Sequence, residues 1–152
     1  WRTDPRAEAR RSREARARGK ARLKLGSLAL YALPGSPTLY YGDEAGLEGF
    51  EDPFNRRTYP WGEEDKELLD WFAALGKLRK TRAALRRGEL EWLPCSERTV
   101  GFVRHLDGEC LTVCLNAGTE PAELELPAGE TVSLPPLSGV LLDGDGNQLL
   151  HT

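Results

Sequence analysis

Apolar and polar residues follow a helical period at the start of the chain. The pattern predicts a helix over residues 5–33, which is polar and basic at first and apolar almost all round from Leu23 onward. A helix that is apolar on every side is largely buried, so we expect residues 19–33 to pack inside something large. Pro34 and Gly35 end this helix, because proline cannot continue it.

A second helix is predicted after the acidic residues 63–65, whose negative charges suit the positive end of a helix dipole. Its apolar residues recur every three or four positions, its last turns are basic, and Gly88 is a typical C-terminal stop. The stripe that we expect in the core consists of Leu68, Phe72, Leu75 and Leu78, with Trp71 beside it.

Between the two helices, Thr38 to Tyr41 reads as a short apolar strand that Gly42 closes. The loop that follows is long, and loops of this length inside a compact domain are uncommon and usually functional or disordered. Disordered segments are poor in aromatic residues. Because this loop carries four of them, we expect it to fold onto something; they are Phe50, Phe54, Tyr59 and Trp61.

From Glu89 onward the pattern changes to short alternating runs, such as RTVGFVRHL and CLTVCLNA, which glycine, proline and asparagine turns separate. Regular short strands with turn signals are typical of an antiparallel β-sandwich. We therefore predict two parts, residues 1–88 and an all-β domain over residues 89–152.

The first part is incomplete as a domain, because a lone strand has no ladder partner and two apolar helices cannot cover each other. Its helix–strand–loop–helix order suits the closing piece of a (β/α)8 barrel. The predicted fold class is therefore α+β: a terminal barrel piece followed by a small antiparallel β-sandwich. In such barrels the loops after the strands form the active-site face, so the long loop is where substrate contacts are expected.

Composition limits the classes of protein to which the chain can belong. No apolar run approaches the roughly 18 residues of a membrane span and no signal-peptide pattern opens the sequence, so no membrane partner is expected. The absence of methionine predicts a piece of a longer protein.

Cys110 and Cys114 on one strand would lie about 13 Å apart, too far for a disulfide. With Cys95, they are predicted to be free thiols in a reducing, cytoplasmic compartment rather than a zinc site.

Charge is uneven along the chain. Residues 1–24 carry a net charge of +7 in a chain whose total is −3. A basic arm can bind nucleic acid, but acidic residues are interspersed among these arginines, several of which share one helical face. We predict a solvated helix and no nucleic-acid partner; nucleic-acid binding through residues 1–24 is the alternative.

Several segments resemble the α-amylase family of glycoside hydrolases. GSPTLYYGDEAGL is similar to the segment around the eighth barrel strand of that family, and EDPFNRRTYPW resembles a loop of its neopullulanase, cyclomaltodextrinase and maltogenic amylase subgroup. ELLDWFAALGKLRKTRAALRRGELEWL is similar to the eighth helix and its passage into the C-terminal β domain. The resemblance is specific over Gly19 to Leu93. The β domain resembles the family only in its position after the eighth helix.

The resemblance implies a retaining mechanism on α-1,4-glucans such as maltooligosaccharides and cyclodextrins. That mechanism needs a carboxylate nucleophile and a carboxylic acid roughly 5–5.5 Å apart, and the family places both before the seventh strand's loop. None of the motifs that carry them is in this sequence, so no catalytic residue is assigned and the chain by itself is expected to be inactive. No cofactor or metal ion is expected either, since no ligand cluster supports a calcium site.

The resemblance also suggests roles for individual residues. Asp52 and Arg56 match residues that hydrogen-bond a glucosyl unit of the substrate; the alternative is that they pair with each other and pin the loop. Glu44 matches a residue that holds the loops under the active site, and Gly42 matches the glycine that lets the chain turn. Outside the resemblance, the aromatic pair at the end of the loop (Tyr59 and Trp61) is left open between stacking on a sugar and packing within the loop.

A hypothesis of another class is a non-catalytic carbohydrate-binding or assembly module, which the self-contained β half and the aromatic residues Trp92 and Phe102 favour. An exposed barrel strand and helix would leave large apolar faces, and such faces are association surfaces. Self-association is therefore expected as well.

Overall fold

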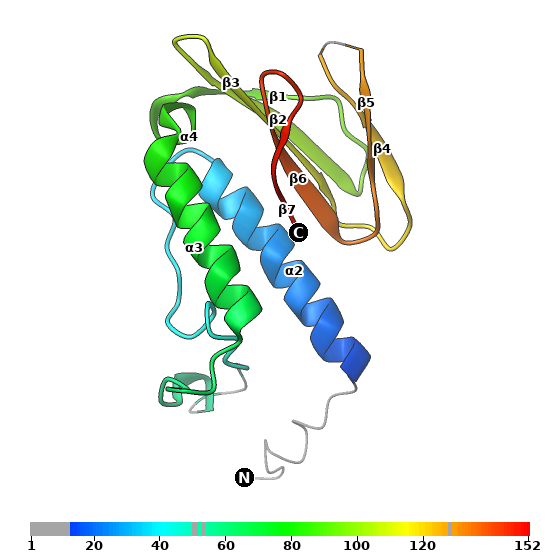
Figure 1. Ribbon diagram of the computed structural model, residues 1–152. Helices are drawn as coiled ribbons and strands as arrows, with labels where there is room; N and C mark the ends of the chain where they lie inside the picture. The colour runs from blue at the N-terminus through cyan, green and yellow to red at the C-terminus, as the bar shows by residue number, and fades with distance from the viewer. Residues whose placement is uncertain (1–12, 50–51, 53, 128) are drawn as a thin grey trace.

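The computed structural model describes residues 13–49, 52, 54–127 and 129–152 (Figure 1). Two long helices lie side by side and contact each other, and a short helix follows the second. The first predicted helix is confirmed within these residues, and its residues 5–12 lie outside them. The second was predicted as one helix up to Gly88, but Arg82 is extended (φ −95°, ψ 112°) and divides it in two. The helical elements are α2 (Arg13–Ala32), the short 3-10 helix η1 (Phe54–Arg56), α3 (Lys66–Thr81) and α4 (Ala83–Arg87).

The rest of the described chain is antiparallel β structure, as the alternating pattern predicts. Five strands form one sheet in the order β1-β2-β3-β6-β7, and the remaining two form a separate hairpin. The strands are β1 (Glu89–Trp92), β2 (Thr99–Leu106), β3 (Glu109–Asn116), β4 (Ala122–Glu125), β5 (Thr131–Leu134), β6 (Ser138–Asp143) and β7 (Gln148–His151).

The strand predicted at Thr38 to Tyr41 does not form: this segment is irregular up to a turn that begins at Tyr41. The prediction is wrong for a physical reason. A strand is defined by its ladder of hydrogen bonds to a neighbour, and no strand among the described residues pairs with this segment. Tyr40 and Tyr41 are consequently exposed, by 53% and 43%.

The central strands β2, β3 and β6 of the five-stranded sheet are buried on both faces, and the molecule has three layers (Figure 1). Alternate residues of a strand point to opposite faces. Phe102, Leu111 and Leu141 face the helices, where they pack in one core with Leu28 of α2 and Phe72 of α3. The other face packs against the β4–β5 hairpin through a second cluster that includes Val103, Cys114, Leu124, Leu134 and Val140. The α+β fold class with an antiparallel β half is thus confirmed.

One hydrophobic core therefore joins side chains from both predicted parts of the chain. The division at residue 88 remains a prediction.

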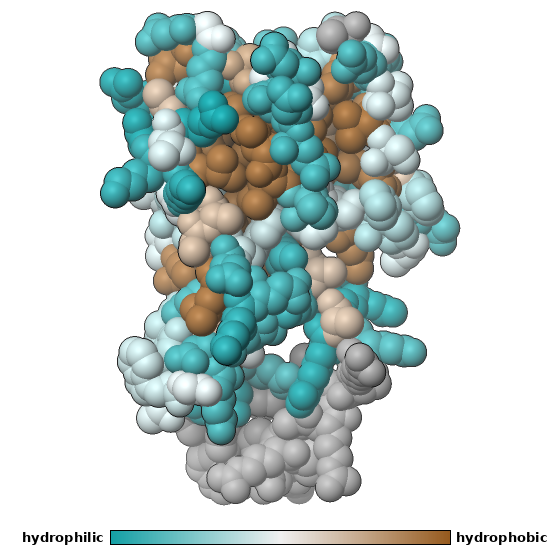
Figure 2. Space-filling view, in the orientation of Figure 1, coloured by the Kyte–Doolittle hydropathy of each residue, from teal (hydrophilic) through white to brown (hydrophobic). Residues whose placement is uncertain are grey.

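Figure 2 shows the hydropathy of one face of the molecule. Apolar side chains gather over the strands, while hydrophilic side chains cover most of the helical part.

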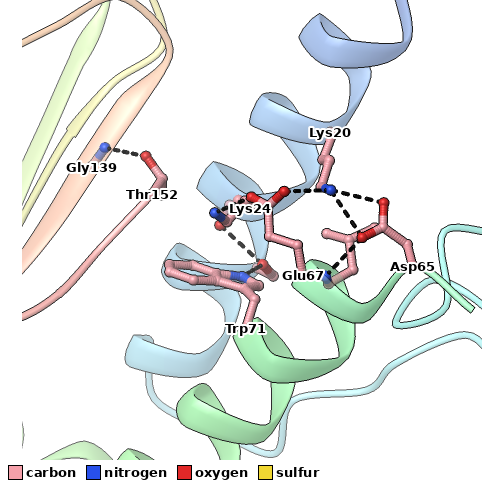
Figure 3. Close-up of polar contacts among 9 residues, drawn as sticks. Lys20, Lys24, Asp65, Glu67, Trp71, Gly139 and Thr152 are labelled. Atoms are coloured by element: carbon pink, nitrogen blue, oxygen red, sulfur yellow. Dashed lines mark hydrogen bonds and ion pairs between the residues drawn. The ribbon is translucent and has the colours of Figure 1, made fainter.

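Helix α2 packs closely on the sheet at Gly139 of β6. A Cβ atom at Gly139 would lie 2.6 Å from Leu115 Cδ2 and 3.0 Å from Leu25 Cδ1. Glycine is needed there because any side chain would push the helix away from the strand. The Gly139 N–H donates to Thr152 Oγ1 at 3.0 Å, which brings the end of the described chain to the same place (Figure 3).

The end of α2 is held by two arginine side chains from other elements. Arg104 of β2 is 1% exposed, and its guanidinium donates to the carbonyl oxygens of Ala32, Gly88 (2.8 Å) and Glu89 (3.3 Å). Arg79 of α3 donates to three further carbonyl oxygens, those of Tyr31, Leu33 and Gly35.

These contacts have a simple cause. The last carbonyl groups of a helix lack intrahelical partners and carry the negative end of its dipole. Two guanidinium groups therefore bind there, even though burial and their mutual repulsion lower the pKa of Arg104. This arrangement links α2, α4 and the sheet at one point.

Arg104→Met keeps the side chain's length but leaves the carbonyls of Ala32, Gly88 and Glu89 without their donor. We expect it to lower the free energy of unfolding by about 3 kcal/mol or more, because each buried unsatisfied polar group costs about 1–3 kcal/mol. The exposed Arg22 of α2 provides the matched control, Arg22→Met. Urea denaturation followed by circular dichroism measures both, and equal midpoints for the two variants would contradict this role of Arg104.

Candidate functional site

The loop between α2 and α3 makes its first sharp turn at Gly42, which is buried and has φ of +91°. The Gly42 N–H donates to Glu44 Oε2 at 2.9 Å, and the Leu47 N–H donates to the Gly42 carbonyl at 2.8 Å. A Cβ atom at Gly42 would lie 2.8 Å from the Leu47 side chain. Only glycine satisfies both the backbone conformation and this close approach.

The Glu44 carboxylate connects that turn to the far end of the loop. Burial and the nearby charge of Glu44 raise the pKa of Tyr59. Burial and the Glu44 charge also raise the pKa of Asp43. Glu44 thus binds the Gly42 turn and lies near Tyr59 at the other end of the loop, as a structural role for it would require.

Asp52 and Arg56 lie on the exposed side of the loop, at and just before η1. Arg56 Nη2 lies 2.5 Å from Asp52 Oδ1, and each side chain is 62% exposed. An ion pair so open to solvent contributes less than about 1 kcal/mol to stability. Each group also keeps hydrogen-bonding capacity beyond this contact, because a carboxylate has two acceptor oxygens and a guanidinium five N–H donors.

The aromatic residues at the end of the loop differ in their surroundings. Tyr59 is half-buried, and its ring lies 4.6 Å from the ring of Trp61 at an interplanar angle of 48°. Trp61 is 81% exposed. Packing within the loop therefore accounts for Tyr59 but not for Trp61. Another contact fixes this arm of the loop: the Tyr41 hydroxyl donates to the Arg57 carbonyl at 2.9 Å.

The loop ends at a cluster of charges between α2 and α3 (Figure 3). Asp65, in the predicted acidic run, is the N-cap of α3: its side chain accepts from the Leu68 N–H at 3.2 Å. Its backbone N–H donates to the Ala45 carbonyl at 3.0 Å. The Lys20 ammonium lies 2.8 Å from Asp65 Oδ2 and 2.6 Å from Glu67 Oε2. The loop is thereby joined to both helices.

Sequence reasoning missed the second part of this cluster. Lys24 binds Glu67 at 3.0 Å, and its ammonium lies 4.9 Å from the ring centroid of Trp71. The Trp71 indole N–H donates to Ser27 Oγ at 2.8 Å. The available signal was the i,i+4 spacing of Lys20 and Lys24 on one helix face, opposite the acidic start of α3.

The titration behaviour of this cluster follows from its contacts. Burial raises the pKa of Asp65, but hydrogen bonds from Lys20 and from the Leu68 N–H outweigh it and leave that pKa below its ordinary value. Hydrogen bonds from Lys20 and Lys24 lower the pKa of Glu67. Burial lowers the pKa of Lys20, yet its two carboxylate partners produce a net rise.

The described part of the chain contains neither a metal-binding cluster nor a reactive thiol. No group of three or more His, Cys, Asp or Glu side chains there could hold a metal ion. Cys95, Cys110 and Cys114 are free thiols, and burial raises the pKa of the Cys114 thiol to about 11. A thiol with so high a pKa is a poor nucleophile.

Comparison with known proteins shows which proteins the chain is similar to. No protein-family model matches it. It is 42% identical over 85 residues to an amylopullulanase of Thermoanaerobacter thermohydrosulfuricus, which is 56% of this chain and 6% of that protein. It is 37% identical over 114 residues to a cyclomaltodextrinase of Geobacillus thermopakistaniensis, which is 70% of this chain and 19% of that protein. The debranching enzyme of Nostoc punctiforme has a similar structure, with a TM-score of 0.73 and 31% identity over 81% of this chain and 31% of that one.

The chain matches a C-terminal part of the α-amylase family. Its relatives in that family are glycoside hydrolases that act on α-glucans. The resemblance to the α-amylase family is confirmed, and the chain spans less than a third of each of the three proteins compared. Among the helices that the structure describes, none has the length and apolar character of a membrane span.

The lowered pKa of Asp65 predicts a loss of stability in acid. A carboxylate whose folded pKa lies below its unfolded value of about 3.9 stabilises the protein above that value, and the stabilisation disappears as pH falls through the folded pKa. Asp65→Asn keeps the helix cap and removes the charge. At pH 7 we expect it to be less stable than the unsubstituted chain by at most about 1 kcal/mol, because Asp65 is about one-third exposed.

The difference between the two proteins should become smaller as pH falls below the unfolded pKa of about 3.9. Urea denaturation at several pH values measures it, with Asp70→Asn, an exposed position on the same helix, as the control. A difference that is as large in acid as at neutral pH would contradict the charge-based explanation.

Proposed function

We propose that this chain forms the C-terminal part of a retaining glycoside hydrolase, and that the loop between α2 and α3 contacts its α-1,4-glucan substrate. The observation that carries the proposal is the Asp52–Arg56 pair, which is exposed on a loop anchored at both ends. The names of its relatives, amylopullulanase and cyclomaltodextrinase, support maltooligosaccharides or cyclodextrins as the substrate class.

The chemistry of the pair suits a sugar. Carboxylate oxygens accept hydrogen bonds from sugar hydroxyls, and a guanidinium donates through a planar fork. Pairing between Asp52 and Arg56 also orders the two side chains before a ligand arrives, which lowers the entropic cost of binding. The two roles that the sequence left open are therefore compatible, since the ion pair pre-forms the contact.

Within this proposal, residues 1–88 belong to the end of a catalytic barrel and residues 89–152 form the C-terminal β domain. The reacting carboxylates lie elsewhere in the parent enzyme, which we place in the cytoplasm. As a hypothesis, the 152-residue chain binds glucan and does not hydrolyse it, since it lacks the paired carboxylic acids that a retaining mechanism needs.

A second candidate function has one observation in its favour. Trp92 on the edge strand β1 is 60% exposed, and its ring stands edge-on to Phe102 at 5.5 Å. An exposed tryptophan on a sheet edge suits a non-catalytic carbohydrate-binding module. Leu30 of α2 and the tyrosines at 40 and 41 are also exposed, which favours self-association through the helical half.

Isothermal titration with maltoheptaose tests the proposed site. We expect saturable heat with the unsubstituted chain, and binding at least about tenfold weaker for Asp52→Ala and Arg56→Ala, because each loses a charged hydrogen bond worth roughly 1.5–3 kcal/mol. Asp145→Ala, an exposed position in the turn before β7, serves as the control and should bind normally.

Product analysis of the same mixtures should detect no glucose or maltose. Their release by the purified chain would refute the inactivity hypothesis. Unchanged affinity of both loop variants would refute the assignment of Asp52 and Arg56.

A further inference from the structure

Trp61 is the most exposed of the large apolar side chains in the part of the molecule that the structure describes, at 81%. An indole is mostly apolar surface, and leaving it in water forgoes the burial that usually stabilises such a side chain. Single exposed apolar residues are common on proteins, so exposure alone assigns no role. The way in which Trp61 is supported gives the further evidence.

The indole rests on a turn that fixes its backbone. The Trp61 N–H donates to the Tyr59 carbonyl at 3.0 Å, and the Glu63 N–H donates to the Pro60 carbonyl at 3.0 Å. Gly62, with φ of +83°, supplies the left-handed residue that closes the turn. The turn therefore presents the tryptophan in a set direction.

The ring itself is supported by Tyr59, whose ring centroid is 4.6 Å away. The charge of Glu44, the residue that also accepts from the Gly42 N–H, contributes to the raised pKa of Tyr59, so its carboxylate lies near the tyrosine hydroxyl. A flat apolar face is thus held open to solvent by the same contacts that organise the rest of the loop. Such preorganisation lowers the cost of binding a ligand.

We propose that Trp61 stacks on a face of a glucosyl ring in the glucan that Asp52 and Arg56 contact. A glucopyranose ring carries its equatorial hydroxyls around the rim and C–H groups on its faces, so hydroxyls of the glucan suit the polar pair and the C–H face of one glucosyl unit suits the indole. This inference rests on the proposed function and adds to it a residue that recognises the C–H face of a pyranose ring. It also gives the two aromatic residues different roles. The exposed face of the Trp61 indole is the binding platform, and Tyr59 supports that platform from behind without contacting the sugar.

Titration with maltoheptaose tests this with three variants. Trp61→Ala removes the platform and should weaken binding about tenfold, the upper range for an aromatic contact. Trp61→Phe keeps a flat ring and should stay within about threefold of the unsubstituted chain. Trp92→Ala removes the other strongly exposed tryptophan among the residues that the structure describes, and it should leave binding unchanged.

The outcomes separate this inference from the proposed function. Normal binding by Trp61→Ala, together with weak binding by Asp52→Ala, overturns the platform and leaves the polar site in place. The absence of saturable heat with the unsubstituted chain overturns both. Loss of binding in Trp92→Ala alone moves the site to the β domain and overturns both as well.

A purely structural role for Trp61 is tested in the same preparations. An exposed platform predicts that Trp61→Ala has the same urea midpoint as the unsubstituted chain. A clear drop in that midpoint would make Trp61 a packing residue and overturn the inference.

Discussion

The buried guanidinium of Arg104 is the interaction on which the rest of the structure depends. It brings the carbonyl end of α2, the end of α4 and the start of β1 to one point at the edge of the sheet. A cation is normally costly to bury, but here it faces the negative end of a helix dipole and several carbonyl oxygens. Helix α2 consequently ends at a fixed place relative to the sheet, and the loop between α2 and α3 begins there.

The other end of the loop is fixed by a different kind of interaction. Asp65 caps α3, binds Lys20 of α2 and donates its backbone N–H to the loop at Ala45. Between these two anchors, Glu44 accepts from the Gly42 N–H and lies near enough to Tyr59 for its charge to raise the pKa of that tyrosine. A loop held at both ends and in the middle can keep exposed side chains in set positions, which is what recognition of a sugar by a few contacts requires.

Many of these structural features were predictable from the sequence, because neighbouring residues in the chain determine them. The periods of the helices, the alternation of the β half, the acidic start of the second helix and the glycine turn all depend on neighbouring residues. The predicted strand at Thr38 to Tyr41 failed because strand formation depends on a partner elsewhere in space. Arg104 was not recognisable as buried, because arginine in an alternating strand ordinarily faces solvent. The exposure of Trp61 likewise depends on what the folded loop leaves uncovered.

The central claim is that glucan binds the loop between α2 and α3 rather than the β domain. Amide chemical shifts of the 15N-labelled chain, recorded during titration with maltoheptaose, locate the contact directly. The account predicts shifts confined to residues 42–62, with the largest change at the Trp61 indole N–H. Shifts centred on Trp92 and its neighbouring strands, or no shifts at a saturating concentration, would contradict it.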